Sequence, residues 1–327
     1  LQKQAEAVLK NSGYEEISLS SLSTSDYGDL SGLTSTMLDY CEPRHISLSL
    51  PSLRADSFSA QLMERVQKVR KSGLTFACEA GTQRLRDVIN KNITEDDVLH
   101  ACEIAFQGGW NNVKLYFMIG LPTETSEDLD GIAEICKKVA YCWRMNTKNR
   151  ARGVKITASA SCFVPKPQTP FQWDAQNTLA MLQGKQDYMK KIMKTKNVTY
   201  NWHDAKTSVL EGVIARGDRR QGKAIYLAWQ RGCKFDGWDQ LFDYEKWMQA
   251  FADCGLDPAF YANRHREFDE VFPWDHLDYG VKKEFFIEEC KRAYAAQTTP
   301  NCKEKCSHCG AACYKGGICV EKRAGVV

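Results

Sequence analysis

Apolar and polar residues follow two periods along the first half of the chain. Short β-like runs alternate with stretches in which apolar residues recur at helical spacing. The predicted strands cover residues 16–19, 46–50, 74–78, 113–119 and 155–163, and the predicted helices cover residues 26–40, 59–72, 94–108 and 126–146. At Thr94 the hydroxyl can accept the Asp97 amide in a capping box, which marks a helix start. This alternation predicts repeated βα units and a parallel sheet.

The chain opens on a helical pattern and not on a strand. Apolar residues at Leu1, Ala5, Val8 and Leu9 lead to an Asn-Ser-Gly stop, and the first residue is not Met. βα units that begin with a helix imply a strand upstream. We therefore predict an α/β fold, a partial (β/α)6 TIM-like barrel that lacks its first strand, and we interpret the chain as a fragment. Such a barrel carries its active site at the carboxyl ends of the strands.

The composition changes after Pro170, where Trp-rich and charge-rich helical sequence begins and continues to Tyr294. We predict three regions: the partial barrel over residues 1–173, a helical region over residues 174–296, and a cysteine-rich tail over residues 297–327. The tail has few core residues, so its folding is expected to depend on metal.

Size and charge exclude several classes of protein. With 327 residues, of which 43% are hydrophobic, the chain can bury a full core. The net charge of +3 gives no strong electrostatic case for nucleic acid or a membrane as an obligatory partner. No stretch has the roughly 20 apolar residues of a transmembrane helix, and the first residues do not resemble a signal peptide. We expect a cytoplasmic protein.

The cysteines divide into two groups. Fourteen cysteines in a large chain without a signal peptide favour reduced thiols and metal ligation over disulfides. Nine of them are scattered, and we expect these to be ordinary buried residues. The remaining five lie in the tail, and four of these are predicted to bind metal: Cys302, Cys306, Cys309 and Cys313.

The identity of the metal stays open at this stage. Four thiolates suit either an iron–sulfur cluster or a structural zinc ion, and Cys319 or His308 could replace one ligand. The alternative is a set of unligated thiols. Cys302, Cys306 and Cys309 also have C-x3-C-x2-C spacing.

Two segments at predicted strand ends are candidates for ligand binding. After residues 74–78 the chain reads Glu79-Ala-Gly-Thr-Gln-Arg84, in which an acid is followed by Gly81 at a sharp turn. After residues 113–119 it reads Gly120-Leu-Pro-Thr-Glu-Thr125, in which Gly120 allows close backbone approach and Pro122 fixes the turn. The alternative for the first segment is a turn with a solvated Glu79.

These two segments, with Lys91 between them, look like the E-[SA]-G-[ST]-x-R and G-L-P-x-E-T elements of radical S-adenosylmethionine (SAM) proteins. Further segments are similar to an uncharacterised family of radical SAM proteins with an upstream cobalamin-binding-like domain. These are LPSLR from Leu50, KLYFMIG from Lys114, and FVPKPQTPFQW from Phe163. The resemblance covers nearly the whole chain.

The resemblance implies a radical enzyme. It implies reductive cleavage of SAM at a [4Fe–4S] cluster, and a 5′-deoxyadenosyl radical that acts on a substrate. An electron donor such as a flavodoxin or ferredoxin would reduce the cluster, and the resemblance leaves room for cobalamin.

The same resemblance assigns cofactor contacts. Glu79 would meet the methionine amino group or the ribose, and Arg84 the methionine carboxylate or a nearby acid. The predicted cofactor-binding residues are Ser21, Ser23, Glu79, Gly81, Arg84, Gly120, Leu121, Pro122, Phe163, Val164 and Pro165.

The chain departs from the superfamily pattern in one respect. In radical SAM proteins the C-x3-C-x2-C motif follows the first barrel strand, whereas here that spacing occurs only in the tail. We expect the radical cluster's ligands upstream of this chain and an auxiliary site in the tail. The other interpretation is that Cys302, Cys306 and Cys309 themselves hold the radical cluster.

Weaker signals lie in the helical region, where aromatic residues mix with charge. Candidate substrate contacts are His203, Arg216, Arg219, Arg220 and His276. Arginine can clamp a carboxylate or phosphate, and histidine titrates near neutrality. The alternative is buried ion pairs and satisfied histidines that hold helices to the barrel.

Two other functions remain alternatives to the enzyme. One is a non-catalytic scaffold with an iron–sulfur or zinc module, and the other is an RNA-binding or RNA-modifying protein that uses the basic triplet Arg216, Arg219 and Arg220. The pattern of residues does not specify the substrate or the type of reaction.

Overall fold

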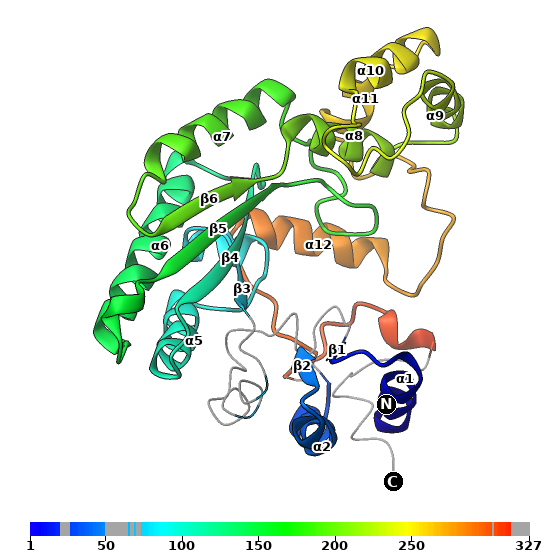
Figure 1. The fold of residues 1–327 in the computed structure, drawn as a ribbon. Helices are drawn as coiled ribbons and strands as arrows, with labels where there is room; N and C mark the ends of the chain where they lie inside the picture. The colour runs from blue at the N-terminus through cyan, green and yellow to red at the C-terminus, as the bar shows by residue number, and fades with distance from the viewer. Residues whose placement is uncertain (20–26, 50–64, 66–68, 70–72, 303, 315–327) are drawn as a thin grey trace.

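The fold contains two parallel sheets, a small one near the N-terminus and a larger one in the middle of the chain (Figure 1). The structure is a computed structural model, and it describes residues 1–19, 27–49, 65, 69, 73–302 and 304–314. The strands are β1 (Glu16–Ser18), β2 (Ser47–Ser49), β3 (Leu74–Glu79), β4 (Asn112–Ile119), β5 (Lys155–Cys162) and β6 (Val198–Trp202).

Helices separate most of these strands. They are α1 (Gln2–Ser12), α2 (Leu30–Cys41), α4 (Gln83–Val88), α5 (Glu95–Gln107), α6 (Ser126–Asn146), α7 (Leu179–Ile192), α8 (Ala205–Ala215), α9 (Gln221–Gln230), α10 (Tyr244–Asp253), α11 (Pro258–Ala262) and α12 (Lys283–Tyr294). Short 3₁₀ turns are η2 (Glu42–Arg44), η4 (Arg150–Arg152) and η5 (Ala311–Tyr314). None of the helices in the described ranges is long and apolar enough to span a membrane.

The larger sheet has the order β3-β4-β5-β6, and all neighbouring strands are parallel. Along β4, alternate residues are fully buried: Val113, Leu115, Phe117 and Ile119. Helices α5, α6 and α7 cover one face of the sheet (Figure 1). The prediction of an α/β fold with a parallel sheet is therefore confirmed, and its βα units resemble part of a barrel.

Capping fixes where the long helices begin. At α5, Thr94 and Asp97 form the predicted capping box, and Thr125 and Asp128 form a second one at α6. Each box satisfies backbone N–H groups that have no partner within the helix. The prediction for residues 126–146 is confirmed, and that for residues 94–108 agrees within one residue at each end. The predicted helix over residues 59–72 lies almost wholly outside the described residues.

One strand was not predicted. The region over residues 174–296 was expected to be helical, but β6 (Val198–Trp202) pairs in parallel with β5 and adds a strand to the sheet. The prediction was wrong here because the strand is short and only partly buried, so its own pattern is weak. Pairing with β5 is what stabilises this segment as a strand.

The small sheet pairs β1 with β2 and has its own apolar cluster. Met37 and Leu38 of α2 pack with Leu48 of β2, and Ala5 of α1 and Ile17 of β1 pack against them. These strands match the predicted ranges 16–19 and 46–50 to within one residue.

Candidate functional site

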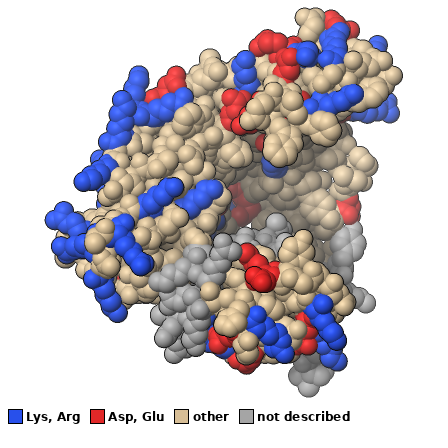
Figure 2. All heavy atoms as spheres, viewed as in Figure 1, with Lys and Arg blue, Asp and Glu red and all other residues tan. Residues whose placement is uncertain are grey.

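Three loops lie at one edge of the larger sheet, because β3, β4 and β5 pair in parallel. They follow Glu79, Ile119 and Cys162, and they contain most of the predicted cofactor residues. Figure 2 shows a hollow at the centre of this face of the molecule, and atoms of Asp or Glu residues are visible inside it. The predicted contacts Ser21 and Ser23 lie outside the described residues.

Glu79 ends β3 in an unusual backbone conformation. Its φ is 65°, a left-handed value that few non-glycine residues adopt, and the register with β4 shifts between Ala77 and Glu79. Its side chain is about a quarter exposed, and Lys91 Nζ lies 2.8 Å from Glu79 Oε1. A bulge and a left-handed residue re-aim a side chain, so the backbone here presents a carboxylate at the strand end.

Arg84 ties the β3 loop to the β4 loop. Its guanidinium donates to the hydroxyl and the carbonyl of Thr123, both at 3.0 Å, and it pairs with the buried carboxylate of Asp128. Two possible partners were predicted for Arg84, the methionine carboxylate or a nearby acid. In the structure Arg84 pairs with an acid, Asp128. Burial disfavours ionisation of Asp128, but hydrogen bonds from Thr82, Thr125 and Arg84 outweigh it and hold the pKa of this carboxyl below its usual value.

Gly81 serves helix packing. A Cβ atom there would lie 2.1 Å from the carbonyl oxygen of Asp128 and 2.5 Å from the nitrogen of Ile132. From the other side, a Cβ atom at Gly131 would lie 2.5 Å from the Gly81 oxygen. The β3–α4 turn and α6 therefore touch backbone to backbone, which only glycine permits.

The β4 loop folds around a buried acid. Gly120 has a φ of 82°, and its N–H donates to both carboxylate oxygens of Glu124, at 3.0 and 2.9 Å. Lys185 of α7 pairs with Glu124 at 2.5 Å. Burial raises the pKa of Glu124, and Lys185 offsets this only in part. Glu124 and Asp128 were not predicted as site residues, although both lie in or just after the GLPTET segment.

The β5 loop gives the edge an apolar wall. The N–H of Phe163 donates to the Ile119 carbonyl at 2.8 Å, which continues the sheet pairing past β5. Leu121 packs in one cluster with Phe163, Phe171 and Ala293 of α12. Val164, Pro165 and Gly120 are buried, and Pro122 is half-buried. The predicted apolar residues of the β4 and β5 loops thus lie beside one another.

The predicted substrate residues differ in burial and in their partners. Arg216 is 1% exposed and donates to the backbone carbonyls of Tyr261 and Asp174, and burial lowers its pKa to about 9. Arg220 pairs with Asp218. His203, Arg219 and His276 are exposed. Arg216 therefore connects segments that are distant in sequence, and its contact with a substrate stays a prediction.

The structure brings together a cluster that the sequence did not reveal. Asp174 is buried, Tyr294 donates to its Oδ1 atom, and His265 Nδ1 lies 3.8 Å from the same oxygen. Its Oδ2 atom is buried and has no partner among the described residues. These residues come from the β5 loop, the end of α12 and the segment after α11, so no local pattern could have joined them.

The scattered cysteines are mostly buried, as expected. Seven of the nine are buried and two are half-buried. Burial raises the pKa of Cys78 and Cys136 to about 12, so these thiols remain protonated at neutral pH.

The tail cysteines are more accessible. Cys302 and Cys313 are exposed, and Cys306 and Cys309 are half-buried. In the part of the chain that the structure describes, no three His, Cys, Asp or Glu side chains are grouped in a way that could hold a metal ion. The metal assignments in the tail therefore stay predictions, and Cys319 lies outside the described residues.

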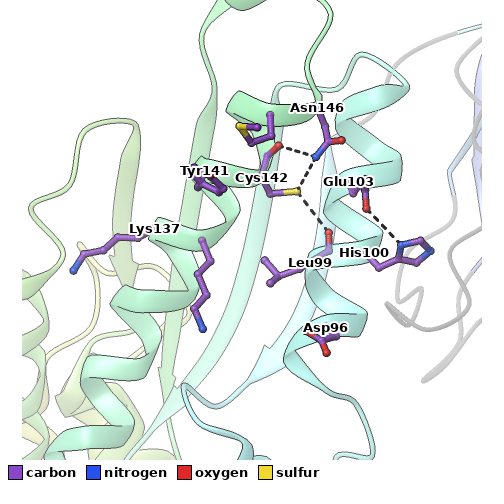
Figure 3. A pocket seen from close by; sticks show the side chains of 10 residues that line it. Asp96, Leu99, His100, Glu103, Lys137, Tyr141, Cys142 and Asn146 are labelled. Carbon is purple, nitrogen blue, oxygen red and sulfur yellow. Dashed lines mark hydrogen bonds and ion pairs between the residues drawn. The ribbon is translucent and has the colours of Figure 1, made fainter.

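A groove elsewhere on the surface is separate from the strand-end loops. It has a volume of about 600 Å³ and lies between α5 and α6 (Figure 3). Leu99, His100, Tyr141 and Cys142 are among the residues that line it, and no residue of the three loops does. It is a feature of the outer helices.

Comparison with known proteins gives the family. Residues 1–136, which include the β3 and β4 loops, match the sequence model of the radical SAM superfamily. The chain belongs to the radical SAM superfamily. The β3 and β4 loops described above are thus parts of a radical SAM domain.

Two relatives from Methanocaldococcus jannaschii are similar to this radical SAM chain. The uncharacterized protein MJ0966 is 32% identical over 221 residues, which are 68% of this chain and 46% of that protein. The uncharacterized protein MJ1620 is 26% identical over 114 residues, which are 35% of this chain and 22% of that protein. The chain thus spans about half the length of the first relative and about a fifth of the second.

Proposed function

We propose that this chain forms the SAM-binding core of a radical SAM enzyme that acts on a substrate not yet known. The observation that carries the proposal is Glu79. It stands at the end of β3 in a left-handed conformation, with Lys91 Nζ 2.8 Å from its carboxylate. This carboxylate can accept hydrogen bonds from the ammonium group or ribose hydroxyls of SAM.

The neighbouring loops would supply the rest of the binding site. The backbone around Gly120, Leu121 and Pro122 and the apolar wall of Phe163 and Val164 suit the flat adenine ring, which needs an apolar surface and a few backbone groups. Arg84 would hold the β3 and β4 loops together through Asp128 and not touch the cofactor itself. When bound, SAM supplies the radical chemistry of the superfamily.

The radical cluster does not fit the described residues. No three suitable side chains are grouped among them. We therefore derive no catalytic step through the cluster, and the activity of the whole protein is part of the proposal. We also propose that an electron donor such as a flavodoxin or ferredoxin reduces the cluster, and that the whole protein uses cobalamin.

The cysteine tail is proposed as an auxiliary site for an iron–sulfur cluster or zinc. Cys302, Cys306, Cys309 and Cys313 supply four thiolates within a short segment, and both metals accept four thiolates.

Replacement of Glu79 tests the SAM site. In Glu79→Gln the carboxylate that would bind the cation is lost, so SAM affinity should fall roughly tenfold, because a charge-assisted hydrogen bond contributes about 1.5–3 kcal/mol. Equilibrium dialysis with labelled SAM measures this on the protein as it stands. Glu134→Gln is the matched control, because Glu134 also pairs with a lysine, Lys137, but on α6 away from the loops. Equal affinity in both variants would remove Glu79 from the site.

A further inference from the structure

The larger sheet has two unlike faces. Helices α5, α6 and α7 bury one of them, and alternate residues of each strand point to the other, which we call the open face (Figure 1). None of the residues that form the open face is buried. They are Thr75 and Ala77 of β3, Lys114, Tyr116 and Met118 of β4, Thr157, Ser159 and Ser161 of β5, and Thr199 and Asn201 of β6.

The open face is polar, which is unusual for a parallel sheet. Such sheets are normally covered on both faces, and a closed barrel fills its interior with branched apolar side chains. Here most side chains carry a hydroxyl or an amide group, and none is Val, Ile or Leu. Hydroxyl and amide groups both donate and accept hydrogen bonds. The open face is therefore suited to a ligand that has several hydroxyl or carbonyl groups.

The strand register arranges these side chains in rows across the sheet. One row contains Thr75, Lys114, Thr157 and Thr199, and the next contains Ala77, Tyr116, Ser159 and Asn201. Neighbouring strands lie about 4.8 Å apart, so a row of four residues is roughly 14 Å wide. The two rows thus offer a continuous polar surface on the scale of a small metabolite.

The open face carries one charge, that of Lys114. Its Nζ atom lies 4.5 Å from the centroid of the Tyr116 ring, and its side chain is half-buried. No Asp or Glu in the described part of the chain forms an ion pair with it. An ammonium group that is held over a ring and has no carboxylate partner can receive the anionic group of a ligand.

The open face continues to the proposed SAM site. Met118, its last residue on β4, packs in the cluster that contains Leu121 and Phe163 of the apolar wall. Glu79 pairs in register with the residue three positions after Lys114. Three residues of a strand span about 10 Å. An anion bound at Lys114 would therefore lie within the length of a small molecule from the strand ends.

We propose that the open face binds the substrate, and that the substrate is a small molecule with several hydroxyl or carbonyl groups and an anionic group, a phosphate or carboxylate, that Lys114 receives. An anion fixed roughly 10 Å below the strand ends would orient the molecule so that its other end lies next to SAM. The role of this face as the substrate site rests on the proposed function. The binding of an anion at Lys114 does not.

Calorimetric titration tests the anion site with three matched probes: D-ribose 5-phosphate, D-ribonate and D-ribose. At low ionic strength the better of the two anions should bind at least tenfold more tightly than the neutral sugar, and the comparison of the two identifies the anionic group. Lys114→Met should remove this advantage, because a hydrogen bond to a charged group contributes about tenfold or more in affinity.

Lys234→Met is the matched control for the charge. Lys234 Nζ also lies over an aromatic ring, 5.4 Å from the centroid of Trp229, but it is exposed and follows α9. This variant should bind each probe as the parent does. If neither anion binds more tightly than ribose, or if both lysine variants lose the same affinity, Lys114 does not receive an anion.

Asn201→Ala tests the hydrogen-bonding part of the surface. It should weaken binding of ribose 5-phosphate about three- to tenfold, the effect of one neutral hydrogen bond, and leave the affinity for inorganic phosphate unchanged. Because Asn201 is exposed, the replacement leaves no buried cavity. Unchanged affinity for the sugar phosphate would show that the open face does not bind the hydroxyl groups.

Titration with SAM separates this proposal from the proposed function. A chain that binds the anionic sugar through Lys114 but does not bind SAM would contradict the proposed function and leave the anion site standing. A chain that binds SAM but shows no binding of either anion that depends on Lys114 would overturn this inference alone.

Discussion

At the scale of single residues, Asp128 organises the candidate site although it is 2% exposed and cannot meet a ligand. It caps α6 through Thr125, accepts from Thr82 on the β3 loop and pairs with Arg84. One carboxylate therefore joins the start of α6 to the β3 and β4 loops. Its charge is what makes this arrangement favourable, because each partner is a donor.

Asp128→Asn should lower the free energy of unfolding by about 1–2 kcal/mol at pH 7, a figure reduced by the partial solvent exposure of Arg84. The folded-state pKa of Asp128 is depressed, so its contribution is complete above the usual carboxyl pKa of 3.8 and is lost as pH falls through the folded value. Urea unfolding followed by tryptophan fluorescence should show the gap between variant and parent closing below that pH.

The control for this experiment is Asp187→Asn on the exposed surface of α7, which should change stability by less than about 0.5 kcal/mol. If Asp128→Asn unfolds at the same urea concentration as the parent at pH 7, the charge of Asp128 does not stabilise the loops.

At the scale of elements, the close contact between the β3–α4 turn and α6 sets the position of the β3 loop. Gly81 and Gly131 face each other across this contact. The turn and the helix are separated by a full βα unit in sequence, so their approach depends on the sheet that carries both. A larger residue at either glycine would push the β3–α4 turn away from α6.

Gly81→Ala should destabilise the protein by about 1–3 kcal/mol, because its methyl group would overlap the backbone of Asp128 and Ile132. Gly184→Ala is the matched control in α7, where an added Cβ meets nothing within 4 Å, and it should stabilise the helix by about 0.5–1 kcal/mol. Thermal unfolding measures both. Destabilisation of the same sign and size in both variants would refute the role of the contact.

At the scale of the whole molecule, α12 links the C-terminal half to the strand ends. Ala293 packs in the cluster with Leu121 and Phe163, and Tyr294 donates to the buried Asp174 on the β5 loop. Burial raises the pKa of Asp174, and the bond from Tyr294 is the largest effect that opposes the rise. The position of α12 beside the candidate site thus depends on a few contacts over long sequence separations.

Tyr294→Phe should lower stability by about 1–2 kcal/mol, because it removes a donor from a buried carboxylate whose other oxygen has no partner in the described part of the chain. Tyr116→Phe is the control, since Tyr116 is 41% exposed, and it should have an effect below about 0.5 kcal/mol. Guanidinium unfolding of both variants makes the comparison. A neutral Tyr294→Phe would mean that water or a rearranged side chain satisfies Asp174.

The sequence by itself determined the order of βα units, the start of α5 at Thr94 and the extent of α6. These depend on periodicity and on caps, which act within about one helical turn. Local motifs in the sequence also identified the loops after β3 and β4 as candidate binding segments. Because the strands are parallel, these loops lie at the same edge of the sheet.

Only the tertiary structure decided which side chains meet. The pairing of Arg84 with Asp128, the ladder that makes a strand of β6, and the hydrogen bond from the Thr299 N–H to Asn90 all join residues that are far apart in sequence. The energy of such contacts depends on burial and on partners brought by other elements, and the residues around Asp174 or Thr299 carry no trace of either. The local pattern thus specifies elements, while the contacts between elements specify the site.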